Sequence, residues 1–193
     1  MASEDIVSYS TMSVPMEMPI VVCDLRPLKG QLELARRAIE ELRISHPVSL
    51  ESNVKASYVS PWKSHLINQN LMPLCKDVVT IANEMSKRVY SSPLEQLNLD
   101  LYVKDCWGIV YEQSDKTMLH NHFPMDFGCA IYLEADEDCA PIIFANHFQF
   151  QPKTGHMVLF PGILNHEIPE NNGRRTVVAM NLCKRTTLQA LEA

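Results

Sequence analysis

The chain has 193 residues, of which 46% are hydrophobic, which suits one medium-sized domain and is too little for two independent ones. Its 17 basic and 23 acidic residues give a net charge of -6, the opposite of the basic excess that nucleic-acid-binding surfaces carry. These values argue against a nucleic-acid partner.

The cysteines and the apolar runs predict the cellular compartment of the protein. The six cysteines have no C-x-x-C spacing, and several fall inside apolar runs such as "VVCD" and "MNLCK", where a free cysteine behaves as a small buried hydrophobe. No cationic, apolar signal segment precedes them, and no apolar run reaches the roughly 18 residues of a membrane-spanning helix. We therefore expect a cytoplasmic protein without a membrane span.

The first half of the sequence predicts an arm followed by helices. Residues 1–20 are rich in Met, Ser and Pro with little periodicity, and we expect an irregular arm there. Apolar residues recur at helical spacing in residues 28–44 and again in residues 67–91, where Pro73 suits a first helical turn. The helical part of the fold is predicted over residues 21–93.

Residues 94–193 predict a β domain. Short apolar or alternating runs follow one another, separated by the turn signals "EADED", "PKTG" and "PENNG". The runs are "LNLDLYV", "WGIVYEQ", "FGCAIYL", "PIIFANHFQF", "HMVLFPG" and "RTVVAMNLC". Several short strands at close spacing favour an antiparallel sandwich or barrel. We predict an α+β fold in which residues 21–193 form one domain, with N-terminal helices packed on the β core.

Two histidines one residue apart, in "LHNHF", are the first candidates for chemistry. In an extended strand His120 and His122 would point to the same face, with Asn121 turned away, as neighbouring metal ligands require. A solvated strand face could carry the same pair without any chemical role.

A third histidine and an arginine lie further along the chain. His166 follows the apolar strand "HMVLFPG", near the expected mouth of a barrel, although a lone histidine there is more often a loop residue. Arg175, nine residues later, opens a strand in which Arg175, Val177, Ala179 and Asn181 share one face. An arginine beside a metal can bind a carboxylate in a bidentate pair, which suggests a dicarboxylate cosubstrate, whereas Arg174 faces the other way.

The order of these motifs resembles the iron(II)- and 2-oxoglutarate-dependent oxygenases, and within them the prolyl-hydroxylase-like branch and the small oxygenases of bacteria and phages. The resemblance covers roughly residues 97–185 and rests on the order and spacing of Tyr111, "HNH", "AIYL", Gly155, "VLFPGILNH" and "RRTVVAMN". It implies a double-stranded β-helix, or jelly roll, that holds iron(II) at one open end.

The same resemblance implies roles for single residues. His120 would be the first metal ligand and His166 the distal one, and both would be catalytic together with Arg175. Arg175 would bind the remote carboxylate of 2-oxoglutarate, and Tyr132 would donate a hydrogen bond to that carboxylate. Tyr111 and Asn181 are weaker candidates for the wall of the cosubstrate site. Before the resemblance is considered, Tyr132 is as easily a core aromatic.

One position departs from the family's pattern. Such sites usually combine two histidines with one carboxylate, and His122 stands where the carboxylate is expected. Either three histidines bind the ion, or Asp126 in "FPMDFG" turns back to supply the carboxylate, or His122 lies outside the ligand set and water takes the third position. The preference for a same-face pair favours His122 over Asp126, which otherwise suits a turn.

The resemblance implies a hydroxylase that acts on a C–H bond and uses O2 while it decarboxylates 2-oxoglutarate to succinate. Two alternatives remain from the residues alone. One is a cupin-like enzyme in which three histidines bind iron, zinc or manganese without 2-oxoglutarate, and the other is a metal-free jelly-roll binding module. The primary substrate stays open among a protein side chain, a peptide and a small metabolite, and a homodimer is a further possibility.

Overall fold

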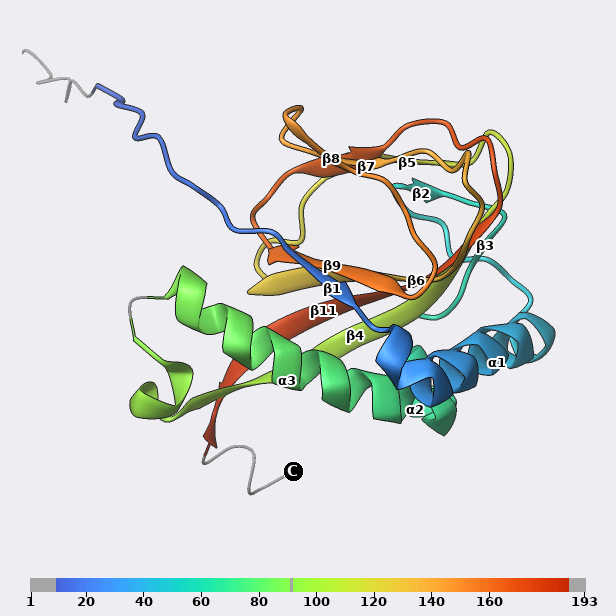
Figure 1. Cartoon of the computed structure of the whole chain (residues 1–193), viewed down its shortest axis with the longest axis horizontal. Helices are drawn as coiled ribbons and strands as arrows, with labels where there is room; N and C mark the ends of the chain where they lie inside the picture. The colour runs from blue at the N-terminus through green and yellow to red at the C-terminus, as the bar shows by residue number, and fades with distance from the viewer. Residues whose placement is uncertain (1–9, 91, 188–193) are drawn as a thin grey trace, which may run out of the picture.

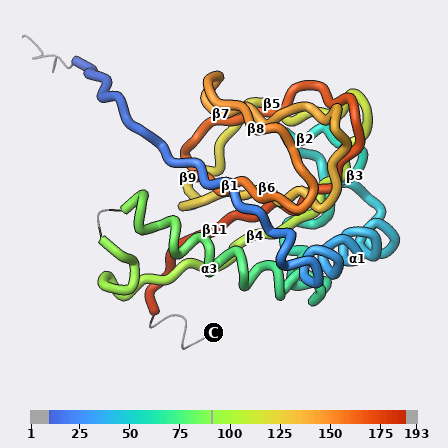
Figure 2. The backbone as a smooth tube through the Cα atoms, in the orientation of Figure 1, coloured from blue at the N-terminus to red at the C-terminus, as the bar shows by residue number. Residues whose placement is uncertain are grey.

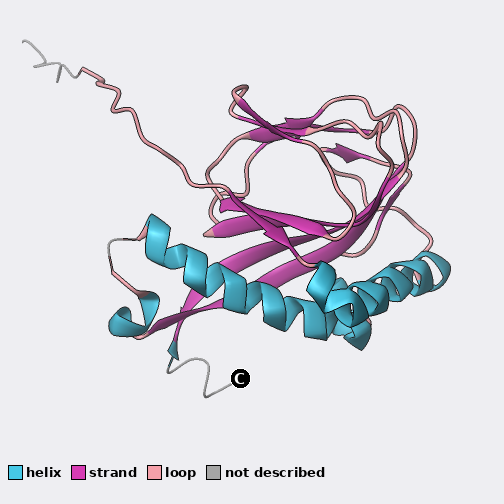
Figure 3. Ribbon diagram, in the orientation of Figure 1, coloured by secondary structure: helices cyan, strands magenta, loops and turns pink. Residues whose placement is uncertain are grey.

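Two antiparallel sheets face each other and form the body of the molecule (Figures 1 and 3). The computed structural model describes residues 10–90 and 92–187. The larger sheet has six strands, in the spatial order β1 (Val21–Asp24), β9 (His156–Pro161), β6 (Phe127–Ala135), β11 (Arg175–Thr186), β4 (Leu99–Tyr111) and β3 (Tyr58–Val59). The smaller has five, in the order β2 (Val54–Lys55), β5 (Lys116–His120), β10 (His166–Ile168), β7 (Ile142–Phe144) and β8 (Phe148–Phe150).

Helices cover only the outer face of the larger sheet, as Figure 3 shows. The two long ones are α1 (Lys29–Ser45) and α3 (Met72–Val89), and both were predicted from the sequence. Helix α3 begins five residues later than expected, because two short elements precede it. These are α2 (Ser64–Ile67) and the 3-10 turn η2 (Gln69–Leu71), and the extended backbone of Asn68 separates α2 from η2. Two further 3-10 turns are η1 (Arg26–Leu28) and η3 (Leu94–Leu97).

The helices and the larger sheet enclose one hydrophobic core. Ile39 and Leu42 of α1 and Leu74 and Val78 of α3 are almost fully buried in it. Gly108 of β4 allows this close approach, because a side chain there would collide with Ile39. Burial of one apolar stripe on each helix therefore fixes the helical layer against the sheet.

A second core fills the space between the two sheets. It is formed by inward-facing aliphatic and aromatic side chains, among them Ile109, Tyr132, Phe144 and Phe160. Alternation along the strands of the larger sheet sends one set of side chains to this core and the other set to the helices. The candidate site lies at one end of this inner core.

The β-rich part of the sequence folds with two differences from the expected strands. The runs "LNLDLYV" and "WGIVYEQ" contribute to one strand, β4, because β11 pairs with it from Tyr111 to Leu99, with a register shift at Lys104 between the two runs. The run "PIIFANHFQF" instead forms the hairpin β7–β8, which turns at Ala145 and Asn146, both with positive φ.

The N-terminal part, predicted as helical, also supplies strands β1, β2 and β3. The tube in Figure 2 shows β1 running along the edge of the larger sheet, where it pairs with β9. Residues 10–20, part of the arm predicted over residues 1–20, have no helix or strand, and residues 1–9 lie outside the described residues. No helix in the described part of the chain has the length and apolar character needed to cross a bilayer.

Candidate metal centre

Strand pairing in the smaller sheet brings His120 and His166 together. His120 ends β5, His166 begins β10, and the two are direct partners across this antiparallel pair. Their ring centroids are 4.2 Å apart. His166 is almost fully buried, with 4% of its surface exposed.

His122 reaches the same place from a loop. The expected strand does not continue to His122 but ends at His120, and the chain then turns, with the Met125 amide donating to the carbonyl of His122 over 2.8 Å. The amide of His122 donates to the carbonyl of Gly162 over 2.7 Å. The two rings lie 5.2 Å apart between centroids, so the "HNH" pair does converge, through a turn and not through strand alternation.

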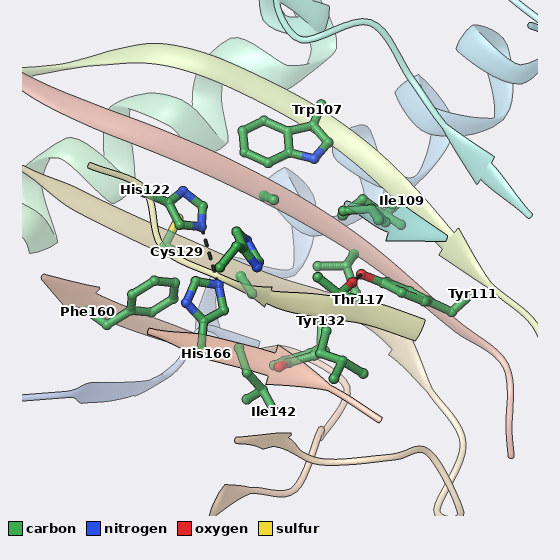
Figure 4. Close-up of a pocket in the computed structure, with 16 residues that line it drawn as sticks. Trp107, Ile109, Tyr111, Thr117, His122, Cys129, Tyr132, Ile142, Phe160 and His166 are labelled. Atoms are coloured by element: carbon green, nitrogen blue, oxygen red, sulfur yellow. Dashed lines mark hydrogen bonds between the residues drawn. The ribbon is translucent and has the colours of Figure 1, made fainter. Parts of the chain in front are cut away.

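The three imidazoles offer nitrogen atoms that all lie within 4.8 Å of one another. Figure 4 shows His122 and His166 facing each other, with their Nε2 atoms 3.3 Å apart. Two nitrogens bound at about 2.1 Å to one tetrahedral or octahedral ion would be about 3.0 to 3.4 Å apart. The spacing of these two atoms therefore fits a shared metal ion.

The outer nitrogen of each ring is held by an acceptor. The Nδ1 atoms of His120 and His166 donate to the carbonyls of Met118 and Leu164, over 2.9 and 3.0 Å. A carbonyl can only accept, so the proton of each neutral ring is on Nδ1 and the lone pair is on Nε2. This is the arrangement by which proteins orient histidine ligands toward a metal.

Burial keeps the imidazoles unprotonated. Desolvation, with a smaller contribution from the neighbouring histidines, lowers the pKa of His122 to about 4 and that of His166 to about 3. The pKa of His120 is lowered by the same desolvation. All three rings are thus in the metal-binding form at neutral pH.

Asp126, the alternative third ligand, does not join the three histidines. Its Oδ1 lies 2.8 Å from Nζ of Lys184 and accepts a hydrogen bond from the hydroxyl of Tyr90 at 3.0 Å. Its Oδ2 accepts from the backbone amide of Lys184 at 2.7 Å. The carboxylate joins β11 to the residue that follows α3, so its contacts are structural.

A mostly apolar cavity adjoins the three histidines and extends between the sheets (Figure 4). The cavity itself has a volume of about 50 Å³, and the empty space is about 470 Å³ when the open solvent at its mouth is included. Its walls carry aliphatic side chains from both sheets together with Trp107, Tyr111, Tyr132 and Phe160. Such a pocket, apolar with a few convergent polar groups, is typical of small-ligand sites.

Arg175 is fully buried beside this cavity and makes no ion pair with any described residue. Its guanidinium carbon lies 4.3 Å from the ring centroid of Tyr111, which lines the cavity, and Nη1 donates to the carbonyl of Ala140 over 2.7 Å. Nε and Nη2 have no hydrogen-bond partner. A buried cation without a counter-ion is costly, so this environment suits an anionic ligand.

Tyr132 adds a further unpaired donor. Its hydroxyl is buried without a partner, and burial raises its pKa, so the group stays protonated and can donate. The hydroxyl of Tyr111, in contrast, already shares a 2.7 Å hydrogen bond with that of Thr117. Tyr111 therefore contributes its ring to the site, under Arg175.

The predicted common face of β11 exists, and its last member has a specific contact. Val177 and Ala179 line the cavity, and Oδ1 of Asn181 lies 2.5 Å from Nδ1 of His122. The sequence predicted Asn181 as a wall residue but did not single out Trp107. Trp107 lines the cavity with a buried, unpaired Nε1, and the alternation of β4 with Tyr111 was the signal that could have placed it there.

The overall arrangement is that of a double-stranded β-helix, and comparison with solved structures agrees. The non-haem α-ketoglutarate-dependent carbocyclase SnoK of nogalamycin biosynthesis is 12% identical, with a TM-score of 0.67 over 86% of this chain and 79% of that one. A prolyl hydroxylase from Trichoplax adhaerens, solved with a hypoxia inducible factor peptide fragment, is 13% identical, with a TM-score of 0.59 over 90% of this chain and 87% of that one.

A third similar structure is HygX from Streptomyces hygroscopicus, solved with nickel and 2-oxoglutarate. It is 12% identical, with a TM-score of 0.58 over 86% of this chain and 82% of that one. The resemblance found in the sequence is thus confirmed at the level of the fold. No family model matches the sequence, and no curated protein does either.

Proposed function

We propose that the protein is a non-haem iron(II)- and 2-oxoglutarate-dependent dioxygenase that hydroxylates a C–H bond of its substrate. The observation that carries this proposal is the joint presence, around one apolar cavity, of three unprotonated imidazoles and the buried, unpaired Arg175. The first group suits a divalent metal and the second suits a carboxylate. A cosubstrate that chelates a metal at one end and carries a carboxylate at the other would use both.

His120, His122 and His166 would hold the ion through their Nε2 atoms. The neutral imidazole donors suit iron, as well as zinc, copper and nickel, so the ligand set fits iron(II) without selecting it. With 2-oxoglutarate and O2, bound iron supplies the oxidising chemistry that converts the cosubstrate to succinate and carbon dioxide.

The remaining residues would bind and orient the cosubstrate. Arg175 would pair with the remote carboxylate through Nε and Nη2, the two donors that have no partner in the protein. The protonated hydroxyl of Tyr132 would donate to the same carboxylate. The apolar walls would exclude water from the metal end, which strengthens these electrostatic contacts.

The three-histidine set also favours a second candidate, a cupin-like metalloenzyme without 2-oxoglutarate. Such an enzyme needs no carboxylate ligand, and three imidazoles suit it directly. It gives no role to Arg175, whose burial without a counter-ion is the reason that we prefer the dioxygenase.

The substrate class is a wider question. Among the similar structures, one prolyl hydroxylase holds a peptide fragment and one carbocyclase belongs to nogalamycin biosynthesis. A peptide, a protein side chain and a small metabolite therefore all remain candidates for this chain.

Turnover of 2-oxoglutarate without a primary substrate tests the proposal. The purified protein, loaded anaerobically with iron(II) and then supplied with 2-oxoglutarate and air, should release succinate slowly. Succinate should not form when O2 is withheld or when His166→Ala replaces the wild type. Metal binding without 2-oxoglutarate binding would favour the cupin-like enzyme, and binding of neither would favour the metal-free module.

A further inference from the structure

Asn181 joins His122 to a carboxylate outside the ligand set. The Oδ1 atom of Asn181 accepts from Nδ1 of His122 at 2.5 Å, and its Nδ2 donates to Oδ2 of Asp105 over 3.1 Å. Asn181 and Asp105 are direct partners on β11 and β4, so strand pairing holds the two side chains together. Asn181 is only 8% exposed, which keeps water from competing for these bonds.

Asp105 determines which way the Asn181 amide points. An ionised carboxylate can only accept hydrogen bonds, so the amide must turn its NH2 group to Asp105 and its oxygen to His122. That oxygen can only accept, so the proton of the neutral imidazole must be on Nδ1. The lone pair is then on Nε2, the atom that faces His166. A carboxylate two hydrogen bonds away thus selects the tautomer of His122.

His122 needs this support more than its two neighbours do. His120 and His166 donate to backbone carbonyls, whose orientation the chain fixes. A side-chain amide is free to rotate by half a turn and to present its NH2 group to the ring instead. Without Asp105, nothing among the described contacts of Asn181 would prevent that rotation.

The net charge of the site with metal and 2-oxoglutarate bound also indicates a role for Asp105. Under the proposed function, a divalent ion, the Arg175 cation and the 2-oxoglutarate dianion leave one positive charge in a site whose three ligands are neutral. Asp105 makes no ion pair with a described residue, and its carboxylate is the charge that the hydrogen-bond chain connects to the ligands. Counting Asp105 brings the sum to zero, which lowers the cost of burying these charges.

We propose that Asn181 and Asp105 are positioning residues for the metal. Asp105 fixes the orientation of the Asn181 amide, and the amide fixes the tautomer of His122. The three ligands include no carboxylate, and the carboxylate of Asp105 acts on them through these two hydrogen bonds. This inference rests on the proposed function for its metal, while its statement about the tautomer concerns the metal-free protein as well. Support of this kind is typically worth tenfold to about a hundredfold in metal affinity.

The first test needs no metal. Two-bond 1H–15N NMR spectra of the metal-free protein report which ring nitrogen of His122 carries the proton. The wild type should show the Nδ1–H form, and Asp105→Asn should show a mixture of both forms. Asp100→Asn is the matched control, because Asp100 lies on the same strand but pairs with Arg185 at 3.0 Å. A pure Nδ1–H form in Asp105→Asn would overturn the inference.

The second test measures cobalt(II) affinity, with the visible spectrum of the bound ion. Asp105→Asn should weaken binding by about tenfold or more, while Asp100→Asn should leave it unchanged. In an Asn181→Asp background, where a carboxylate meets His122 directly, Asp105→Asn should instead have no effect or tighten binding, because it removes a like charge. A general loss of stability would weaken binding in both backgrounds, so this reversal separates positioning from folding.

The outcomes distinguish the two proposals. If the wild type binds cobalt(II) no better than His166→Ala, the metal site itself is wrong, and the NMR result then stands alone. If the wild type binds and Asp105→Asn binds equally well, the positioning role is wrong and the proposed function is untouched.

Discussion

The guanidinium of Arg175 lies over the ring of Tyr111, 4.3 Å from its centroid, and is fully buried without a carboxylate partner. The cation–π contact offsets part of the cost of burying this charge, by about 2 kcal/mol. The rest of the cost is unmet until an anion binds. Arg175 over Tyr111 is therefore the arrangement that we expect in a ligand site and not in a purely structural core.

Arg175→Met should abolish 2-oxoglutarate binding and leave the metal-free fold at least as stable. A buried cation that has no ion-pair partner can be replaced by an apolar side chain of similar length at little cost. We expect a loss of affinity of at least about a hundredfold, because the carboxylate would lose a charged donor pair. Calorimetric titration of the metal-loaded protein with 2-oxoglutarate measures it.

Arg174→Met is the control for this change. Arg174 adjoins Arg175 in the sequence but is half exposed, and its Nε lies 3.5 Å from a carboxylate oxygen of Glu112. The control should bind 2-oxoglutarate like the wild type. Equal binding by both variants would show that Arg175 is not the carboxylate receptor.

Asp126→Asn should destabilise the protein without changing its affinity for metal. The substitution removes the charge that pairs with Lys184 and weakens the bond from Tyr90, at a cost of about 1 to 3 kcal/mol. Urea denaturation measures the first effect and cobalt(II) titration the second. A marked loss of cobalt affinity would return Asp126 to the ligand set in place of His122.

Two glycines on opposite faces of the larger sheet should respond differently to alanine. A Cβ at Gly128 would lie 2.7 Å from the Phe160 ring and 3.2 Å from Cγ of His122, whereas one at Gly108 would collide with Ile39 of α1. Gly128→Ala should therefore displace His122 and weaken metal binding by about tenfold, comparable to the loss of an orienting contact.

Gly108→Ala, in contrast, should leave metal affinity unchanged and cost about 1 to 3 kcal/mol of stability through overpacking. Cobalt(II) titration and thermal unfolding of both variants make the comparison. If Gly128→Ala bound cobalt(II) normally, the close packing of His122 on β6 would not matter for the site.

The metal-free protein should lose stability in acid between about pH 6.5 and pH 4. Burial lowers the pKa of His122 to about 4 and of His166 to about 3 in the folded state, against an ordinary value of 6.5. As the pH falls through this interval, the unfolded chain binds protons at these histidines and the folded chain does not, so unfolding is favoured.

Denaturant unfolding at several pH values measures this loss. His166→Gln should lose less stability over the same interval, because the variant lacks one of the histidines whose pKa is lowered by folding. His147→Gln, at an exposed position in the β7–β8 turn, should follow the wild type. An equally steep loss in His166→Gln would mean that other groups control the acid sensitivity.

The sequence by itself determined the fold class and the candidates for chemistry. Helical periodicity in residues 28–44 and 67–91, and strand alternation beyond residue 94, are local properties that survive into the structure as α1, α3 and the strands of two sheets. The spacing of His120, His166 and Arg175 supported the resemblance to the oxygenases, because strands of a jelly roll return to the same end of the fold.

Only the tertiary structure decided how the candidates meet. The pairing of β5 with β10 sets His120 opposite His166, and a turn that no periodicity reveals brings His122 to them. The contacts of Asp126 with Lys184 and Tyr90 take it away from that group, and the pairing of β4 with β11 sets Asp105 beside Asn181. These are contacts between residues 36 to 76 positions apart in the chain. Local sequence sets which face a side chain takes, but the partner across the sheet depends on register and loop path, which the whole fold fixes.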